Sequence, residues 1–184
     1  MRVEVLIAGR GGQGILLMGH VLGNAAARYS GYYVTATESY SAETRGGDSR
    51  ADVIIADSEE ELDYIKVRRA DIAVFMFSEQ AVKYSGLVPR NSSVFIDTTY
   101  VRDVPAAGWR VFGAPYTRIA EVRVGTFRVA NLVALGHVVG VTGLVKPEHV
   151  LKSVEDVVRE EWVKANKEAF KLGLKLPRGI TYQP

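Results

Sequence analysis

The sequence contains no cysteine. That absence excludes disulfide bonds, thiolate nucleophiles and iron–sulfur clusters held by cysteine, so any redox centre of this kind must belong to another chain. An excess of charge of one sign is also lacking, because 23 Lys and Arg stand against 21 Asp and Glu, for a net charge of +2. The composition therefore gives no electrostatic reason to expect a nucleic-acid partner.

Long hydrophobic runs are scarce. The most apolar segment, residues 129–145, is only about 17 residues long, which is short for a bilayer-spanning helix, and it contains Asn131 and His137. We interpret it as a buried helix whose small residues let neighbouring backbones approach closely. The first residues enter a strand-like run without the features of a signal peptide, which predicts a cytoplasmic protein with no membrane partner.

Short β-branched runs alternate with helical patterns over most of the chain. This alternation predicts an α/β fold of three layers, Rossmann-like, with a mostly parallel sheet and helices on both faces. The expected strands cover residues 3–8, 32–37, 51–56, 72–77, 94–97 and 110–113. The first helical pattern runs from Ile15 to Tyr29, and a short helix capped by Ser78 is expected through Tyr84.

Strand signals stop in the last third, where two C-terminal helices are expected over 126–141 and 147–172. Pro147 suits the first turn of the second helix, and Gly173 is expected to end it. No linker or repeat divides the chain, so we expect a single domain over 1–176 and a C-terminal tail over 177–184 that is mobile or ordered only against another chain.

A glycine-rich turn follows the first expected strand. Gly9, Gly11 and Gly14 have the G-x-G-x-x-G spacing, which places backbone N–H groups at a helix N-terminus where an anion can bind. The turn could receive an anionic group, a dinucleotide in particular, or it could be a structural or interface turn. The candidate binding residues are Gly9, Gly11, Gly12, Gln13 and Gly14.

A polar loop over residues 38–50 follows the second expected strand. It leaves the sheet at the carboxyl edge, as the glycine turn does, so the two loops should be neighbours. Ion pairs among Glu43, Arg45 and Asp48 could simply order it. Alternatively it contacts a ligand or another subunit, and the candidate interface residues are Glu43, Thr44, Arg45, Gly46 and Gly47.

No complete catalytic or metal-binding set is apparent. The three histidines lack metal-ligand spacing, and no serine or carboxylate pair has a spacing that indicates catalysis. We therefore name no catalytic residue and no metal ligand. A further rim element is the stretch Asp97-Thr-Thr-Tyr100, which follows a strand and could be only a turn.

Several motifs occur in a specific order. Gly9-Arg-Gly-Gly-Gln-Gly14 comes first, Tyr40-Ser-Ala-Glu-Thr-Arg-Gly-Gly47 follows, then Asp52-Val-Ile-Ile-Ala-Asp57, and near the end come Asn131-Leu-Val-Ala-Leu-Gly136 and Asn166-Lys-Glu-Ala-Phe-Lys-Leu-Gly173. With these motifs, nearly the whole chain resembles the gamma subunit of 2-oxoacid:ferredoxin oxidoreductases, the stand-alone form of the gamma domain in pyruvate:ferredoxin oxidoreductase. The sequence of residues 40–57 is more similar to the 2-oxoglutarate branch of this family than to the pyruvate branch. A departure lies at Ser41-Ala42, where the commoner pattern has Gly-Pro.

The resemblance implies a non-catalytic subunit of an enzyme that oxidatively decarboxylates a 2-oxoacid, forms an acyl-coenzyme A and reduces ferredoxin. It assigns thiamine diphosphate, magnesium and [4Fe–4S] clusters to companion alpha, beta and delta subunits, with no cofactor bound firmly by this chain. The glycine turn would then border the coenzyme A (CoA) site or contact a subunit. Whether the isolated chain forms a homodimer stays open.

The alternative function is a free-standing, dinucleotide-binding dehydrogenase domain. In such a site an acidic residue about 20 positions after the turn binds a ribose hydroxyl, and Glu38 stands approximately there. A third possibility is a nucleotide-free regulatory or scaffold domain.

Overall fold

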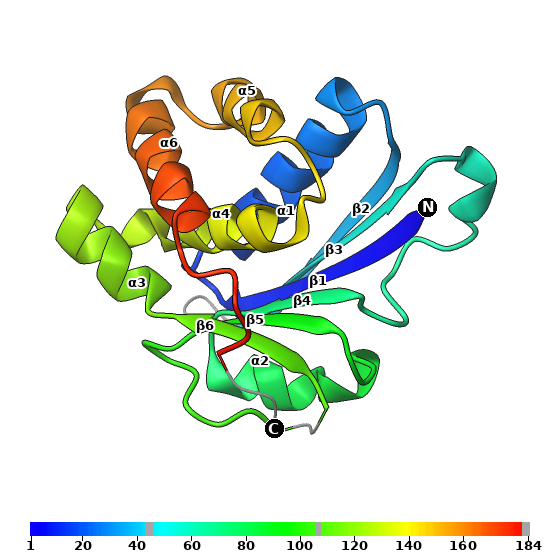
Figure 1. Cartoon of the computed structure of the whole chain (residues 1–184), viewed down its shortest axis with the longest axis horizontal. Coiled ribbons are helices and arrows are strands. Elements are labelled where there is room, and N and C mark those ends of the chain that lie inside the picture. Colours follow the sequence, from blue (N-terminus) through cyan, green and yellow to red (C-terminus); the bar gives the residue numbers. More distant parts are fainter. Residues whose placement is uncertain (43–45, 106–107, 182–184) are drawn as a thin grey trace.

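The computed structural model describes residues 1–42, 46–105 and 108–181. Its centre is a six-stranded sheet of order β2-β3-β1-β4-β5-β6 (Figure 1). The strand β3 is antiparallel to both of its neighbours, and the remaining pairs are parallel. The strands are β1 (Arg2–Arg10), β2 (Tyr33–Tyr40), β3 (Asp48–Ala56), β4 (Ile72–Phe75), β5 (Ser93–Asp97) and β6 (Arg110–Ala114). The expected mostly parallel sheet is confirmed.

The direction of β3 explains the connections on either side of it. A hairpin joins β2 to β3, so its loop lies at the edge where β1 ends, with Arg10 of β1 paired to Asp48 of β3. Because β3 then ends at the opposite edge, where β4 begins, residues 57–71 need no crossover helix. That connection carries only a 3₁₀ turn, Glu59–Glu61.

Helices cover both faces of the sheet, as the sequence predicts, but unequally. Figure 1 shows α1, α4, α5 and α6 on one face and α2 on the other. Along β1, Val5 and Ile7 face the larger group, whereas Leu6 and Ala8 face the side of α2. The helices are α1 (Ile15–Asn24), α2 (Ser78–Lys83), α3 (Tyr116–Ile119), α4 (Ala130–Thr142), α5 (Pro147–Val157) and α6 (Glu160–Leu174). The first helix continues as a π-helical turn, Ala25–Tyr29, and a 3₁₀ turn, Phe127–Val129, precedes α4.

The buried helix expected within 129–145 is confirmed as α4, which is buried from Ala130 to Val139. Its closest neighbour is α6, and the two cross at glycines. A Cβ atom added to Gly136 would overlap the carbonyl oxygen of Phe170 and lie 2.9 Å from the Cα of Gly173. Gly173 lies inside α6 and does not end it. Glycine is required at this position because α4 and α6 pack closely there.

The helix expected over 147–172 is two helices, so that prediction was wrong. Val158 and Arg159 have extended backbone angles and separate α5 from α6. The buried positions explain the break: α5 buries Val150 and Val154 near α1, whereas α6 packs mainly on α4, and one straight helix cannot reach both. Ser78 also differs from expectation, since it is the first residue of α2 and its hydroxyl donates to the Tyr100 carbonyl instead of capping the helix.

The described part of the C-terminal tail lies along β6, an edge strand of the sheet. The Thr181 N–H donates to the Val111 carbonyl at 2.7 Å, and the Gly113 N–H donates to the Thr181 hydroxyl at 2.8 Å. At the start of the tail, the Pro177 carbonyl oxygen lies 2.8 Å from Nε2 of the buried His137 ring. Residues up to Thr181 are thus ordered against their own chain, contrary to our expectation.

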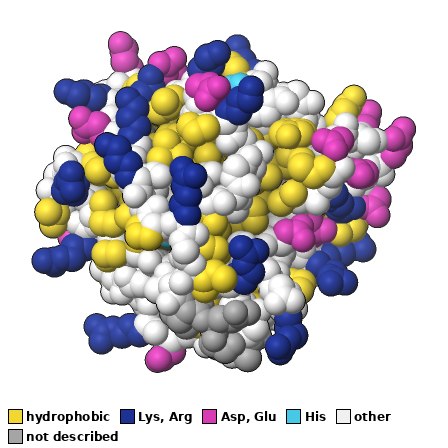
Figure 2. All heavy atoms as spheres, viewed as in Figure 1, with side chains coloured by type: hydrophobic (Ala, Val, Ile, Leu, Met, Phe, Trp, Pro, Cys, Tyr) yellow, Lys and Arg dark blue, Asp and Glu magenta, His cyan; other side chains and the backbone are white. Residues whose placement is uncertain are grey.

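The surface carries mixed charge. On the face shown in Figure 2, Lys and Arg side chains are spread among apolar and acidic ones. Within the described residues, no helix is both long and apolar enough to cross a membrane.

Candidate functional site

The glycine turn connects β1 to α1 at the carboxyl edge of the sheet. Gly12 and Gly14 have φ angles of +93° and +71°, which side chains other than glycine rarely adopt. The Gly11 N–H donates to the Gly47 carbonyl at 2.8 Å. This bond confirms that the glycine turn and the loop between β2 and β3 are neighbours.

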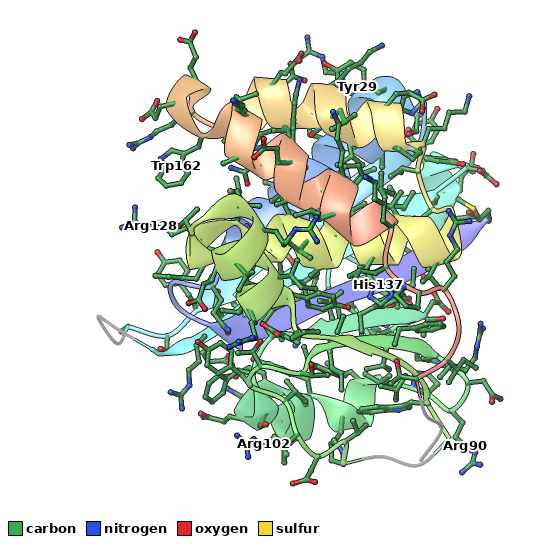
Figure 3. All side chains as sticks on the ribbon, turned by 60° about the vertical axis from the view of Figure 1, so that its left-hand side comes forward. Tyr29, Arg90, Arg102, Arg128, His137 and Trp162 are labelled. Carbon is green, nitrogen blue, oxygen red and sulfur yellow. The ribbon has the colours of Figure 1, made fainter. Side chains whose placement is uncertain are left out.

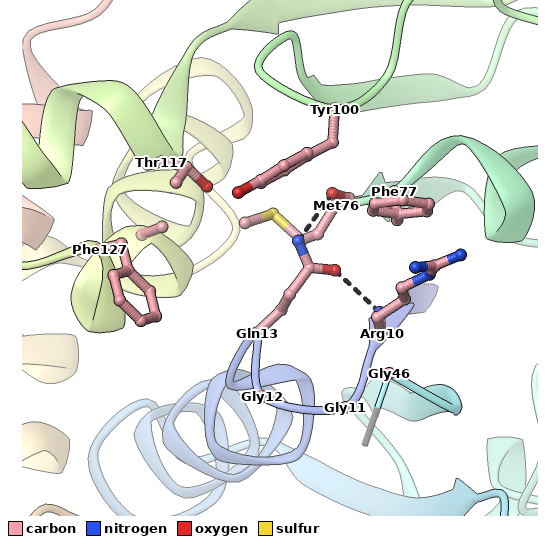
Figure 4. A pocket seen from close by; sticks show the side chains of 11 residues that line it. Arg10, Gly11, Gly12, Gln13, Gly46, Met76, Phe77, Tyr100, Thr117 and Phe127 are labelled. Carbon is pink, nitrogen blue, oxygen red and sulfur yellow. Dashed lines mark hydrogen bonds between the residues drawn. The ribbon is translucent and has the colours of Figure 1, made fainter. Parts of the chain in front are cut away.

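Gln13 braces the turn from inside. Its side-chain oxygen accepts the Arg10 N–H at 2.8 Å, and its side-chain nitrogen donates to the Met76 carbonyl at 2.9 Å (Figure 4). A Cβ atom on Gly9 would lie 2.7 Å from that oxygen, so glycine is required there for the brace to fit. Gln13 therefore ties the turn to the end of β4.

Asn131 braces the turn from α4. Its side-chain nitrogen donates to the Gly14 carbonyl at 3.0 Å, and a Cβ on Gly14 would overlap this amide. The Asn131 amide oxygen accepts the Leu132 N–H. Two motifs that are separate in the sequence, the glycine turn and Asn131–Gly136, thus form one structural unit.

A pocket of about 290 Å³ opens beside the turn. The Arg10 guanidinium lies 3.9 Å from the centre of the Phe77 ring, and the Phe77 and Tyr100 rings are 5.6 Å apart (Figure 4). Phe127 forms the opposite wall and is 54% exposed. Aromatic and apolar walls with one cation at the rim suit a ligand that has both a flat or apolar part and an anionic part.

The backbone around the turn is electropositive. The first turn of α1 contains no acidic residue, and no side chain caps this helix. Within the described residues, the N–H groups of Gly12 and Gly14 have no hydrogen-bond acceptor. The buried Nε atom of Arg10 also has none there, although its Nη2 contacts Glu79 at 3.3 Å. Among the described residues, no acceptor therefore competes with an anion for the N–H groups of Gly12 and Gly14.

Asp97 supports the rear of the pocket at the end of β5. Its carboxylate is fully buried and accepts the Thr117 hydroxyl at 2.6 Å and the Thr99 N–H at 3.1 Å. Burial raises the pKa of Asp97, and the Thr117 hydroxyl offsets part of this rise. Because Thr117 lines the pocket, Asp97 acts as its positioning residue.

The loop between β2 and β3 is anchored on α2. Ser41 N–H donates to the Asp48 carbonyl at 2.9 Å, and the Asp48 carboxylate accepts hydrogen bonds from Gln80 and Tyr84. Burial would raise the pKa of Asp48, but these donors and Lys83 lower it. Asp48 thus bonds to α2, while Glu43, Thr44 and Arg45 lie outside the described residues.

The structure brings the five candidate residues of the turn together with Gly46 and Gly47. Sequence reasoning missed Arg10, Thr117 and Phe127, because only the fold places 117 and 127 beside the turn; Arg10 lies within the motif and could have been noted. Glu38 is exposed on β2 and does not line the pocket. Among the described residues, no three His, Cys, Asp or Glu side chains group as metal ligands.

Comparison with known proteins identifies the family. The model of the pyruvate ferredoxin/flavodoxin oxidoreductase family matches residues 4–176. The chain belongs to this family. It is 39% identical over 182 residues to the 2-oxoglutarate synthase subunit KorC of Methanothermobacter thermautotrophicus, covering 96% of this chain and 95% of that one. KorC of Methanocaldococcus jannaschii is 34% identical, with 98% and 96% covered.

A solved structure agrees with the family assignment. The gamma subunit of the keto/oxoacid ferredoxin oxidoreductase of Geobacter sulfurreducens superposes with a TM-score of 0.82 at 32% identity, covering 94% of this chain and 96% of that one. The expected similarity to the gamma subunits, and to the 2-oxoglutarate branch among them, is therefore confirmed. The comparisons do not favour a free-standing dinucleotide-binding dehydrogenase.

Proposed function

We propose that this chain is the gamma subunit of a multisubunit enzyme that oxidatively decarboxylates 2-oxoglutarate or a related 2-oxoacid to an acyl-CoA and reduces ferredoxin. The observation that carries this proposal is the full-length similarity to relatives named 2-oxoglutarate synthase subunit KorC. Similarity at this level and coverage supports a common role in assembly.

The companion alpha, beta and delta subunits hold the thiamine diphosphate, magnesium and [4Fe–4S] clusters in this proposal. The composition of this chain supports the division, since a chain without cysteine cannot supply cysteine ligands to a cluster. Ferredoxin then meets the complex through another subunit. The cytoplasmic location stays a prediction from the sequence.

The glycine turn and its pocket border the CoA site in this proposal. Part of a 2-oxoglutarate:ferredoxin oxidoreductase from Magnetococcus marinus, described with 2-oxoglutarate, coenzyme A and succinyl-CoA bound, shares the fold; the match covers 99% of this chain and 32% of that one, with a TM-score of 0.82 at 21% identity. In this chain, the chemical groups around the pocket support the proposal that it borders the CoA site. N–H groups that have no acceptor among the described residues, the guanidinium of Arg10 and an aromatic wall fit a ligand with phosphates and a base.

The loop over Glu43 to Gly47 is proposed as a subunit contact. Gly46 lines the same pocket as Gly12, so a subunit bound to this loop would also close the pocket.

Co-expression with the companion subunits tests the proposal. We expect an affinity-tagged form of this chain to recover thiamine diphosphate and iron–sulfur clusters in constant ratio to itself. Recovery of a homo-oligomer that carries neither group would overturn it.

A further inference from the structure

Another hollow lies where α5 ends and α6 begins, next to the segment 127–130 that also lines the aromatic pocket. It has a volume of about 380 Å³, and we call it the α5–α6 groove. Its polar lining consists of Arg128, Arg159 and Asn166, and its apolar lining consists of Leu17, Val129, Val157, Val158 and Trp162. No carboxylate lines it within the described residues.

Asn166 gives the groove an unused hydrogen-bond acceptor. The side chain is 4% exposed, and its nitrogen donates to the Trp162 carbonyl at 2.8 Å. Because a carbonyl only accepts, the nitrogen must face Trp162 and the side-chain oxygen is the free end. Within the described residues this buried oxygen has no partner. A buried acceptor without a donor is rare, so a water or a bound molecule must supply the donor.

The two arginines make the groove basic. The Arg128 guanidinium lies 5.7 Å from the centre of the Trp162 ring, and Figure 3 shows these two side chains next to each other. Arg128 and Arg159 are exposed, and neither forms an ion pair within the described residues. Tryptophan and arginine beside aliphatic side chains are typical of the centre of a protein interface.

The neighbouring surface of α5 and α6 is different. There Lys167 pairs with Glu155, and around Val158 and Val163 three lysines stand among three glutamates: Lys164, Lys167 and Lys171 with Glu155, Glu160 and Glu168. Opposite charges compensate one another on this surface, and lysine is depleted at interfaces. The contrast separates a solvated face from the α5–α6 groove on the same two helices.

We propose that the α5–α6 groove binds an acidic segment of a companion subunit. A carboxylate of that segment pairs with Arg128 or Arg159, a backbone N–H donates to the Asn166 side-chain oxygen, and an apolar side chain packs on Trp162. Charge complementarity selects an acidic occupant. Leu17 lines both this groove and the hollow beside Gly12 and Gly14, so the contact would continue toward the glycine turn. This inference rests on the proposed role as a subunit.

Photocrosslinking in the assembled complex tests the proposal. A benzophenone amino acid replaces Trp162 in the co-expressed complex, and the same amino acid at Lys164 serves as the control. We expect position 162 to cross-link to a companion-subunit peptide that contains Asp or Glu, and position 164 to give at least tenfold less product. A link to a second copy of this chain, to a peptide without acidic residues, or no intersubunit link would overturn the proposal.

Charge reversal gives an independent readout. We expect Arg159→Glu to lower the share of the complex that survives moderate salt at least tenfold, and Lys164→Glu to leave it unchanged. Asn166→Ala removes the buried acceptor and should weaken assembly; because it also removes the hydrogen bond to the Trp162 carbonyl, assembly is compared at a temperature at which the free variant is fully folded. Equal behaviour of Arg159→Glu and Lys164→Glu would contradict the groove assignment. If the unsubstituted chain recovers no companion subunits, the proposed function fails instead.

Discussion

The side-chain nitrogen of Gln13 donates to the Met76 carbonyl at 2.9 Å, across the space between the glycine turn and the end of β4. The same side chain accepts the Arg10 N–H. Both polar atoms of the Gln13 side chain therefore form hydrogen bonds within the protein. In the proposed CoA-bordering role, ligand contacts at the turn would therefore come from the backbone N–H groups and from Arg10.

Replacing Gln13 by alanine should destabilise the chain. The substitution leaves two partly buried backbone groups without partners, at a cost of about 1–3 kcal/mol. Urea unfolding of the full chain measures this, with Glu121→Ala on the exposed surface as the control. A change within about 0.5 kcal/mol of the control would show that the brace contributes little to stability.

The crossing of α4 and α6 should tolerate no methyl group. Gly136→Ala forces the two backbones apart, and we expect a loss of about 3 kcal/mol or failure to fold. Gly86→Ala is the matched control, because a Cβ there meets nothing within 4 Å. Thermal unfolding should show a large drop in melting temperature for Gly136→Ala alone. Equal melting temperatures would mean that the helices are less closely packed than described.

Glu4 should make stability depend on pH in the acid range. Burial alone would raise the pKa of Glu4, but the Tyr64 hydroxyl, the N–H groups of Arg68 and Arg69, and Arg2 outweigh it and lower the pKa. A carboxyl with a lowered pKa stabilises the fold above its unfolded pKa of about 4.3, and this contribution is lost as pH falls through the folded pKa.

The variant Glu4→Gln isolates this contribution. Hydrogen bonds to a charged group contribute roughly 1.5–3 kcal/mol, so we expect a difference of that size from the unsubstituted chain at pH 7. The difference should begin to shrink below about pH 4.3, where Glu4 of the unfolded chain binds a proton, and should be lost as pH falls through the lower folded pKa of Glu4. Urea unfolding at several pH values measures it. A difference that grows on acidification would contradict the assigned sign.

His137 should remain neutral at pH 7. Burial lowers its pKa, and the Pro177 carbonyl opposes this only in part. Because a carbonyl accepts, Nε2 carries the proton and Nδ1 accepts from the Tyr116 hydroxyl, 2.7 Å away. Stability from this group is present above the unfolded pKa of about 6.5 and is lost as pH falls. NMR titration should place the His137 midpoint below 6.5, with His137→Gln confirming the assignment; a midpoint above 6.5 would contradict it.

The aromatic pocket should influence the use of CoA if it borders that site. In the complete complex, we expect Arg10→Gln to raise the KM for CoA about 5- to 30-fold, because a charge-assisted hydrogen bond contributes roughly 1–2 kcal/mol, and to leave the KM for the 2-oxoacid unchanged. Arg110→Gln, on the exposed edge strand β6, is the control. Equal CoA KM values for both variants would remove the pocket from the CoA site.

Much of the fold follows from local patterns in the sequence. Strands such as β1 and β4 are buried on both faces of the sheet. They are therefore continuous apolar runs, which can be seen in the sequence without a structure. The reversal of β3 is not, because β-branched residues look the same in parallel and antiparallel strands. The break at Val158 was also missed, since no glycine or proline marks it and only packing on two different helices requires it.

The candidate site was predictable where one motif contains it. The glycine turn and its neighbour loop could be placed at one sheet edge from the order of strands and loops. Thr117 and Phe127 could not, because they come from α3 and the turn before α4, and only tertiary structure brings them to Gly12. The Asn166 side-chain oxygen, which lacks a partner in the described part of the chain, is likewise a tertiary feature that only the surroundings reveal.

The most direct test of the central claim is reconstitution of activity. Companion subunits purified with and without this chain are assayed for dye reduction that depends on both a 2-oxoacid and CoA. The proposed function predicts activity only when the chain is present, restored in proportion to the amount added up to one copy per complex. Full activity of the companion subunits without it would contradict the claim.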